Sequence, residues 1–245
     1  MKRPIHIAAF VFAIGLVLLS SLAVAQEAKT KKPKSKTKKT PAHFTPPEVQ
    51  EGLPNVLLIG DSISIGYMIP TRKALAGQAN VWRPTTNCGP TTKGVESVEK
   101  WLGDRKWDVI HFNFGLHDLK YMGPNNENLA DPKAESSHQQ VPIEQYVVNL
   151  KQIAERLKET GATVIFCETT PVPEGCKGRV VGDSIKYNEA ARKAMQEVGD
   201  IEINPLFAFA KEHADQRTSN VHYSVEGSSK LAEQVASVVL AAIKK

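Results

Sequence analysis

Short apolar runs alternate with amphipathic stretches along most of the chain, from about residue 55 to the C-terminus. Nearly continuous apolar runs, such as residues 109–112, are typical of strands that are covered on both faces of a sheet. Strands that alternate strictly with helices predict right-handed parallel crossovers. The pattern therefore predicts an α/β fold, a three-layer α/β/α sandwich around a mostly parallel five-stranded sheet. The expected strands are residues 55–59, 81–83, 107–114, 163–169 and 201–203, and the expected helices are residues 64–76, 94–102, 143–160, 184–198 and 226–243.

Two long polar segments interrupt this pattern: residues 121–142, rich in asparagine, and residues 171–182, with two prolines and three glycines. Loops of this length at the functional edge of a sheet often form the walls of a substrate site. Ligands of parallel sheets bind beyond the carboxyl ends of the strands, where Ser62, residues 115–118 and residues 169–171 are expected to lie. We therefore expect the functional site at this edge.

The N-terminus has the pattern of a secretion signal. Lys2 and Arg3 precede an apolar run of about 13 residues that begins at Ile7, and residues 23–25 (Ala-Val-Ala) are suitable for a cleavage site. Because a helix needs about 20 apolar residues to span a bilayer, this run predicts a cleaved signal peptide, residues 1–25, with an uncleaved N-terminal anchor as the alternative. The protein is therefore expected to be exported, either periplasmic or secreted.

A segment of low complexity follows, residues 26–46, in which seven lysines fall between Lys29 and Lys39. It has no apolar periodicity, so it is expected to be a disordered linker. The remaining residues, 47–245, have the length of a single domain with a full core. A solvated linker is the first interpretation of the lysines, and electrostatic contact of this tail with the cell envelope is the alternative.

The net charge of +5 comes from this N-terminal part. The 31 basic residues fall to 22 when Lys2, Arg3 and the seven lysines are left out, and the 26 acidic residues fall to 25 without Glu27. The domain therefore gives no electrostatic reason to expect a nucleic acid as partner. The sequence makes no prediction of the oligomeric state.

The three cysteines, Cys88, Cys167 and Cys176, allow at most one disulfide within the chain. Cys167 and Cys176 are the expected pair, because they are nine positions apart across a strand end and a loop, and an exported protein meets an oxidising environment. The spacing of the cysteines fits no zinc pattern, so no metal site is expected.

The triplet Gly60-Asp61-Ser62 directly follows the first expected strand and precedes the first expected helix. A strand that ends in such a turn lifts one side chain above the sheet edge, beside backbone N–H groups, which suits a nucleophilic serine. His222, just before the last expected helix, is the candidate base for Ser62. Gly89, in a turn after the second strand, is the candidate oxyanion donor together with the amide of Ser62; an ordinary left-handed turn glycine is the alternative.

Four ordered blocks resemble the SGNH hydrolases, the family of GDSL-type esterases and lipases. They are Gly60-Asp61-Ser62, Gly89, residues 115–118 (Gly-Leu-His-Asp) and His222, and the resemblance extends over essentially all of residues 54–245. It implies a flavodoxin-like SGNH hydrolase fold and a carboxylic ester hydrolase with Ser62 and His222 as catalytic residues. It implies no metal or organic cofactor.

Two positions depart from the pattern of this family. Its third block usually has an asparagine where this chain has His117, which we interpret as a substituted oxyanion donor or substrate contact, with a packed strand-end histidine as the alternative. The family usually has an acid three residues before the base, where this chain has Ser219. Three explanations are open: Asp215 or Glu226 orients His222, a backbone carbonyl orients it in a Ser-His dyad, or catalysis has been lost.

The expected activity is hydrolysis of carboxylic esters by Ser62 and His222 through an acyl-enzyme. Short acyl groups, such as acetyl, on extracellular or cell-envelope glycans are the expected substrates. Tyr121, in the first long loop, and Tyr223, after the base, are the expected substrate contacts. The alternatives are a lysophospholipase-like or thioesterase-like hydrolase, which an apolar groove would favour, an acyltransferase, and a noncatalytic glycan-binding domain that has lost the triad acid.

Overall fold

The computed structural model of the chain describes residues 40–213, 218 and 220–245. The expected signal peptide and most of the expected linker lie outside these residues, as do Asp215 and Ser219. Among the helices that the structure describes, none is both long enough and apolar enough to cross a bilayer. The described residues all belong to one compact unit.

Five strands form one sheet in which every neighbouring pair is parallel. They are β1 (Asn55–Ile59), β2 (Asn80–Trp82), β3 (Val109–Phe112), β6 (Thr163–Cys167) and β7 (Ile201–Asn204), in the order β2-β1-β3-β6-β7. The direction in which strands are added reverses between β1 and β3, as in flavodoxin-like folds, and ligands of such sheets bind beyond the strand ends at this reversal. The predicted fold class is confirmed.

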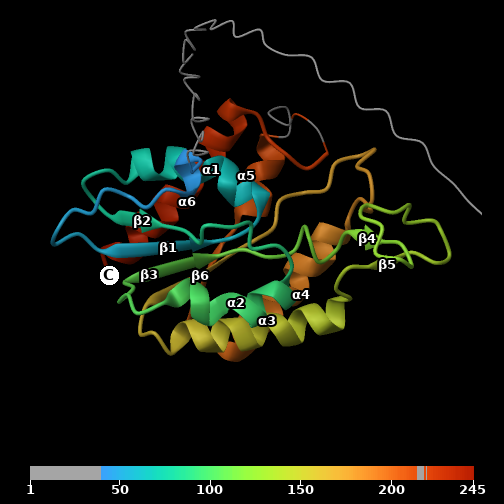
Figure 1. Cartoon of the computed structure of the whole chain (residues 1–245), viewed down its shortest axis with the longest axis horizontal. Helices are drawn as coiled ribbons and strands as arrows, with labels where there is room; N and C mark the ends of the chain where they lie inside the picture. Colours follow the sequence, from blue (N-terminus) through green and yellow to red (C-terminus); the bar gives the residue numbers. More distant parts are fainter. Residues whose placement is uncertain (1–39, 214–217, 219) are drawn as a thin grey trace, which may run out of the picture. The chain divides into compact units, whose positions relative to one another are not determined.

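Helices cover both faces of the sheet (Figure 1). Over one face lie α1 (Ser62–Ala74), α5 (Leu206–Glu212) and α6 (Val225–Ile243), and over the other lie α2 (Thr91–Leu102), α3 (Ile143–Lys158) and α4 (Asp183–Val198). α1 packs against α6, and α3 packs against both α2 and α4. The three layers predicted from the alternation of strands and helices are therefore present.

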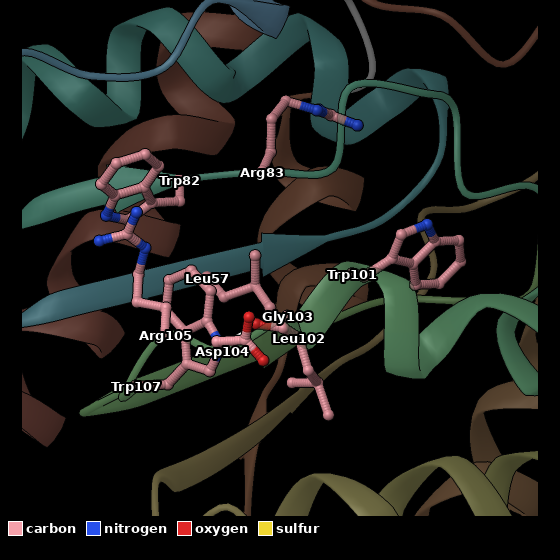
Figure 2. A pocket seen from close by; sticks show the side chains of 9 residues that line it. All are labelled: Leu57, Trp82, Arg83, Trp101, Leu102, Gly103, Asp104, Arg105 and Trp107. Atoms are coloured by element: carbon pink, nitrogen blue, oxygen red, sulfur yellow. Dashed lines mark hydrogen bonds between the residues drawn. The ribbon is translucent and has the colours of Figure 1, made fainter.

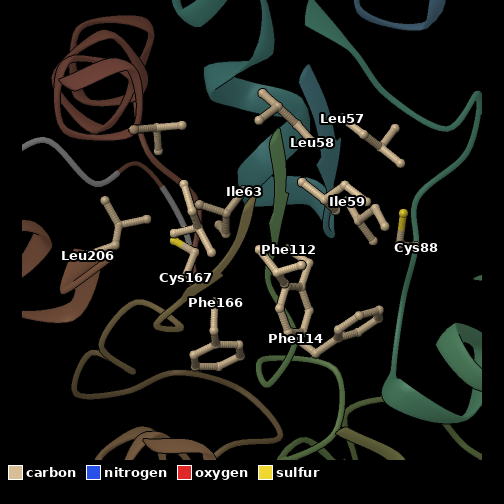
Figure 3. Close-up of a cluster of buried hydrophobic side chains, with 14 of the residues drawn as sticks. Leu57, Leu58, Ile59, Ile63, Cys88, Phe112, Phe114, Phe166, Cys167 and Leu206 are labelled. Atoms are coloured by element: carbon tan, nitrogen blue, oxygen red, sulfur yellow. The ribbon is translucent and has the colours of Figure 1, made fainter. Parts of the chain in front are cut away.

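The hydrophobic core is centred on the sheet, and Figure 3 shows side chains of β1, β3, β6 and α5 within it. All four residues of β3 are buried, and the Phe112 ring meets the Phe166 ring of β6 edge to face, with 5.4 Å between the ring centroids. Aromatic pairs in this geometry contribute about 0.5–1.5 kcal/mol beyond the area they bury. This packed sheet is the base for the turns that follow β1 and β3.

Two boundaries differ from the predicted ones for identifiable reasons. α2 begins at Thr91, three residues before the expected start, because the Asp118 carboxylate accepts hydrogen bonds from the N–H and the hydroxyl of Thr91. β3 is shorter than the expected strand. Trp107 packs in the core before it, and its Nε1 donates to the carbonyl of Leu102 at 3.0 Å.

Two further features have no counterpart in the predicted pattern. α5 follows β7 almost directly and is only seven residues long, too short to show apolar periodicity. The strands β4 (Tyr121–Met122) and β5 (His138–Gln139) pair antiparallel within the segment expected to be a loop. Strands of two residues show no alternation that a sequence pattern could reveal.

The described end of the expected linker contacts the domain. η1 (Ala42–Phe44) is a 3₁₀ turn that lies against α1, and the Arg83 guanidinium lies 5.5 Å from the centre of the Phe44 ring. Secondary structure therefore begins before the boundary expected at Pro46. The physical reason is the aromatic side chain of Phe44, which supplies a cation–π contact that lysines alone do not make.

The disulfide expected between Cys167 and Cys176 is not formed, and none of the three cysteines, all of which the structure describes, is in a disulfide. Cys167 is fully buried at the end of β6, whereas the Cys176 thiol donates to Oδ1 of Asn220 at 2.8 Å. The prediction was wrong because a short spacing in sequence does not turn two side chains toward each other.

Candidate active site

Ser62 is the first residue of α1, directly after the turn that ends β1. Asp61 caps this helix, since its Oδ1 accepts a hydrogen bond from the N–H of Ile63 at 2.9 Å. Gly60 leaves room for the turn, because a Cβ there would lie 2.9 Å from both Cβ and Oγ of Ser64. The Asp61 carboxylate thus stabilises the turn from the positive end of the helix dipole.

A buried arginine holds the same turn from the end of β2. Arg83 is 7% exposed and donates to the carbonyls of Gly60, Pro84 and Thr86 and to the hydroxyl of Ser64 over 3.2–3.3 Å. Burial lowers the pKa of its guanidinium from the ordinary value. Because its acceptors lie in both segments, Arg83 ties the nucleophile turn to the loop that follows β2.

Ser62 and His222, 160 positions apart in sequence, lie in hydrogen-bond contact, with 3.0 Å between Ser62 Oγ and His222 Nε2. His222 lies just before α6, whose first turn is capped by Ser224 Oγ, which accepts from the N–H of Gly227 at 3.0 Å. The carbonyl of His222 accepts from the N–H of Thr218 at 3.0 Å. These contacts place the imidazole where a general base for Ser62 must be.

Among the residues that the structure describes, no carboxylate forms a hydrogen bond or an ion pair with the His222 ring. Glu226, one of the two expected orienting acids, is exposed in the first turn of α6 and is not brought to this ring. Asp215, the other, lies outside the described residues, as does Ser219. Of the expected catalytic groups, the structure therefore brings together the nucleophile and the base.

The amides expected to form the oxyanion hole differ in their availability. The N–H of Ser62 is in the first turn of a 13-residue helix, where backbone N–H groups have no carbonyl partner within the helix. Gly89 has a φ of +65°, and its N–H donates to Oδ1 of Asn87 at 2.9 Å. Asn87 lines the pocket at Ser62, whereas Gly89 is buried and is not among the lining residues, so in this structure its amide serves Asn87.

His117 lines the pocket that contains Ser62. Burial lowers the pKa of His117 from its ordinary value, the charge of Asp61 acts in the opposite direction, and nearby cations lower the pKa further. A neutral imidazole carries one N–H, so His117 can donate to an oxyanion without a charge of its own. The structure therefore brings His117 into the same pocket as Ser62 and His222.

Asp118 connects the end of β3 to α2. Its Oδ1 accepts from the N–H and the hydroxyl of Thr91 at 2.8 and 2.6 Å, while its buried Oδ2 has no partner among the described residues. Burial raises the pKa of this carboxyl to about 7, and the two hydrogen bonds from Thr91 partly offset the rise. The role of Asp118 in the described structure is to cap α2.

Asp118→Asn is expected to change how stability depends on pH. The folded protein keeps the Asp118 proton up to about pH 7, whereas the unfolded chain releases it near pH 4, so this group lowers the free energy of unfolding as the pH rises between these values. The asparagine does not titrate, and its Oδ1 still accepts from Thr91.

Urea unfolding at about pH 5 and about pH 8 should therefore show that the variant gains stability relative to the wild type at the higher pH. Asp104→Asn, which changes an exposed carboxylate, is the matched control. A stability difference between Asp118→Asn and the wild type that is the same at both pH values would contradict the assignment.

Ser62 and His222 line a pocket with a volume of about 290 Å³. Both long loops contribute to it, the first through Asn128 and Leu129 and the second through Arg179. The expectation that these loops form walls of the site is therefore confirmed. Among the described residues, no group of three or more histidine, cysteine or acidic side chains is arranged to hold a metal ion.

The expected substrate contacts Tyr121 and Tyr223 are not among the residues that line this pocket. Tyr121 pairs with Gln139 between β4 and β5, and Tyr223 packs against the hydrophobic core. Both expectations depended on position in a loop, and position alone does not determine which way a side chain points.

Four polar residues of the pocket escaped the sequence analysis: Asn87, Lys120, Arg179 and Asn220. Asn220 has a φ of +54°, and its Oδ1 accepts from Nη1 of Arg179 at 3.1 Å as well as from a cysteine thiol. One feature of the sequence could have pointed to Lys120 and Arg179: each is a basic residue in or beside a long loop at the edge of the sheet where ligands bind.

A larger hollow, of about 480 Å³, shares none of its lining residues with this pocket (Figure 2). Three indoles line it, and the guanidinium of Arg105 lies 3.7 Å from the centre of the Trp82 ring. Trp82 Nε1 donates to Oδ1 of Asn55, and Trp107 is buried. These contacts are those of packing residues, and the hollow contains no nucleophile paired with a base.

In a flavodoxin-like sheet, a serine at the N-terminus of the first helix in contact with a histidine defines an α/β/α serine hydrolase. The model of the GDSL-like lipase/acylhydrolase family matches residues 56–235. The chain belongs to this family, and it is a carboxylic ester hydrolase. No curated protein matches the sequence.

Solved structures of similar fold include an acetyl xylan esterase, 15% identical, with a TM-score of 0.58 over 76% of this chain and 99% of that chain. An acetylxylan esterase from Geobacillus stearothermophilus is 16% identical, with a TM-score of 0.57 over 78% and 94% of the two chains. A lipase/acylhydrolase from Enterococcus faecalis is 14% identical, with a TM-score of 0.61 over 77% and 96%. At these identities the similarity shows the fold.

Proposed function

We propose that the protein is an exported serine esterase that removes short acyl groups, such as acetyl, from glycans through an acyl-enzyme on Ser62. The observation that carries this proposal is the 3.0 Å contact between Ser62 Oγ and His222 Nε2 at the reversal point of the sheet. Export is supported by the signal pattern of residues 1–25. Contact of the lysine-rich tail with the cell envelope is part of the same proposal.

In the first step, His222 Nε2 takes the proton of the Ser62 hydroxyl as Oγ attacks the ester carbonyl carbon. The oxygen of the tetrahedral intermediate accepts from the N–H of Ser62 and from the ring of His117, and from the Gly89 amide once Asn87 gives it up. His222 then passes its proton to the leaving alcohol. In the second step, water loses a proton to His222 and attacks the acyl carbon. The bond between this carbon and Ser62 Oγ then breaks, His222 returns the proton to Oγ, and the acid is released.

The proposed base works without a carboxylate from the described residues. In serine proteases the loss of the orienting acid lowers kcat about 10⁴-fold. The oxyanion hole and substrate binding alone still accelerate the reaction about 10³- to 10⁴-fold over the reaction in water. An ester is more easily cleaved than an amide, so the Ser62–His222 pair is sufficient for a Ser-His dyad. Asp215 stays a proposed alternative partner for His222.

Short acyl groups on glycans fit the size and polarity of the pocket. Its volume of about 290 Å³ is at the small end of the range for ligand sites, roughly 300–1,000 Å³. Its lining is largely polar, and its apolar members are Leu116, Leu129 and Val221. Two of the structures with similar fold are described as acetyl xylan esterases, which supports acetyl esters of glycans as substrates.

The preference for short acyl groups is tested with aryl esters of increasing chain length. We expect kcat/KM to fall about tenfold or more from acetate to octanoate, because a pocket of about 290 Å³ has little room for the added methylenes. Ser62→Ala is the matched control for hydrolysis at other sites. An increase of kcat/KM with chain length would contradict the proposal and favour the lysophospholipase-like or thioesterase-like alternative.

A further inference from the structure

The active-site pocket contains two cations that the proposed chemistry does not use. Lys120 and Arg179 both line the pocket with Ser62 and His222. Lys120 directly precedes β4, and Arg179 lies in the loop before α4. Neither is a nucleophile, a base or an amide donor in the proposed mechanism, so their presence beside Ser62 needs a separate explanation.

The side chain of Lys120 is largely buried, and its ammonium group is unpaired. The residue is only 8% exposed, and within the described part of the chain its Nζ has neither a hydrogen bond nor an ion pair. Nζ is not among the fully buried unpaired atoms, so it still reaches solvent in the pocket. An ammonium group that is held in a pocket and has no partner in the protein is suited to a ligand of opposite charge.

Arg179 is held in place from several sides. Its Nε donates to the carbonyl of Leu116 at 3.0 Å and its Nη1 to Oδ1 of Asn220 at 3.1 Å, and its guanidinium also interacts with the Cys176 side chain. Because a guanidinium has five N–H groups, these contacts leave N–H groups for a ligand. The loop that carries it is fixed by Gly178, whose carbonyl accepts from the N–H of Tyr121 at 2.8 Å. A Cβ at Gly178 would lie 2.4 Å from Cα of Leu129, so the loop packs directly on the first long loop.

The two cations act on each other electrostatically. Burial lowers the pKa of the Lys120 ammonium first, the positive charge of Arg179 lowers it further, and the nearby Asp118 carboxyl acts in the opposite direction. The one carboxylate that lines the pocket is that of Asp61, and it is 2% exposed and already accepts from the N–H of Ile63. His117 has a lowered pKa and adds no positive charge at neutral pH. Among the described lining residues, two cations therefore face one engaged carboxylate.

We propose that Lys120 and Arg179 form a subsite for an anionic group of the substrate, a carboxylate or another oxyanion within the pocket that holds the scissile ester. The subsite deepens the proposed function and rests on it: the preferred glycan is an acidic one, such as an O-acetylated hexuronic acid. A planar guanidinium and an ammonium both form strong, charge-assisted hydrogen bonds to carboxylate oxygens.

The test compares an O-acetylated hexuronic acid with its methyl ester, in which a methyl group replaces the negative charge, and with an O-acetylated hexose phosphate. The release of acetate is measured for all three, so that cleavage of the methyl ester itself is not counted. We expect kcat/KM for the acid to exceed that for the methyl ester by about tenfold or more at low salt, and the ratio to shrink as salt screens the charges. A higher kcat/KM for the phosphate than for the acid would assign the subsite to phosphate, and an equal or higher value for the methyl ester would overturn the proposal.

Lys120→Met removes the ammonium group and keeps the length of the side chain. We expect it to lower the ratio of kcat/KM for the acid to kcat/KM for the methyl ester about tenfold, and we expect the same of Lys120→Gln. The control is Lys177→Met, which changes an exposed lysine two positions before Arg179 and should leave this ratio unchanged. Urea unfolding of each variant shows that it is folded. A ratio unchanged in both Lys120 variants would overturn the proposal.

The subsite and the proposed function fail in different ways. If the wild type hydrolyses aryl acetate through Ser62 but shows no preference for the acid, the esterase mechanism stands and the subsite is wrong. If no ester is hydrolysed, calorimetric titration with free hexuronate and its methyl ester still tests the subsite. Tighter binding of the hexuronate that Lys120→Met abolishes would support the subsite, and equal binding of the two sugars would overturn it.

Discussion

Ser62→Ala is expected to lower kcat/KM for aryl acetate by at least about a thousandfold, since the acyl-enzyme cannot form without the Ser62 hydroxyl. His222→Ala should cause a loss of similar size, because in the proposed mechanism Nε2 of His222, 3.0 Å from Ser62 Oγ, takes the proton of that hydroxyl. Removing either member of a unit that works together abolishes the same pathway, so the double variant should be no slower than the single ones. Steady-state hydrolysis of aryl acetate measures all three.

The matched control is Ser229→Ala, which removes an exposed hydroxyl that donates to the carbonyl of Val225 within α6. It should keep the wild-type rate, which separates the loss of the nucleophile from a general effect of removing a serine. Residual activity of Ser62→Ala within tenfold of the wild type, in folded protein, would mean that another group attacks the ester.

Arg83→Met is expected to lower the free energy of unfolding by about 2–4 kcal/mol. The variant leaves the buried carbonyls of Pro84 and Thr86 without the guanidinium that now donates to them, and each buried acceptor without a partner costs about 1–3 kcal/mol. The same change removes the donor to the Gly60 carbonyl beside the nucleophile. We therefore also expect kcat to fall about tenfold or more, because small displacements of a nucleophile have large effects.

Arg105→Met is the control for the loss of an arginine. Arg105 is exposed and stacks on the Trp82 ring, and a contact of that kind contributes about 0.5–1 kcal/mol. Urea unfolding of both variants beside the wild type measures the two losses. If Arg83→Met and Arg105→Met are equally stable, the guanidinium of Arg83 does not hold the turn in the way that its hydrogen bonds indicate.

The sequence was sufficient for those features that are encoded locally. Each central strand is a nearly continuous apolar run, and the triplet Gly60-Asp61-Ser62 lies between such a run and a helix, so the fold class and the turn that carries Ser62 followed from nearby residues. The position of His222 before the last amphipathic helix identified a candidate base in the same way. The structure places the two side chains in contact as this pattern required.

Features that depend on the path of the loops were not predictable. Lys120 and Arg179 meet in one pocket because residues 171–182 fold back on residues 121–142, through contacts such as that of Gly178 with Leu129. No local pattern encodes such a contact. For the same reason, Cys167 and Cys176 are near in sequence and do not pair.

Long-range hydrogen bonds explain the other differences. The early start of α2 depends on Asp118, 27 positions after Thr91 in sequence, and the engagement of the Gly89 amide by Asn87 depends on the rotamer of one side chain. A pattern of apolar and polar residues contains neither kind of information. The sequence therefore predicted the fold and the pairing of Ser62 with His222 better than it predicted the residues that surround them.

The central claim is that Ser62, activated by His222, attacks the ester. Its most direct test is reaction of the purified protein with a fluorophosphonate probe, followed by mass spectrometry of the intact protein and its peptides. We predict one adduct, on Ser62, that forms in the wild type and is absent from Ser62→Ala and strongly slowed in His222→Ala. A folded wild-type protein that forms no adduct, or that carries it on a residue other than Ser62, would contradict the account.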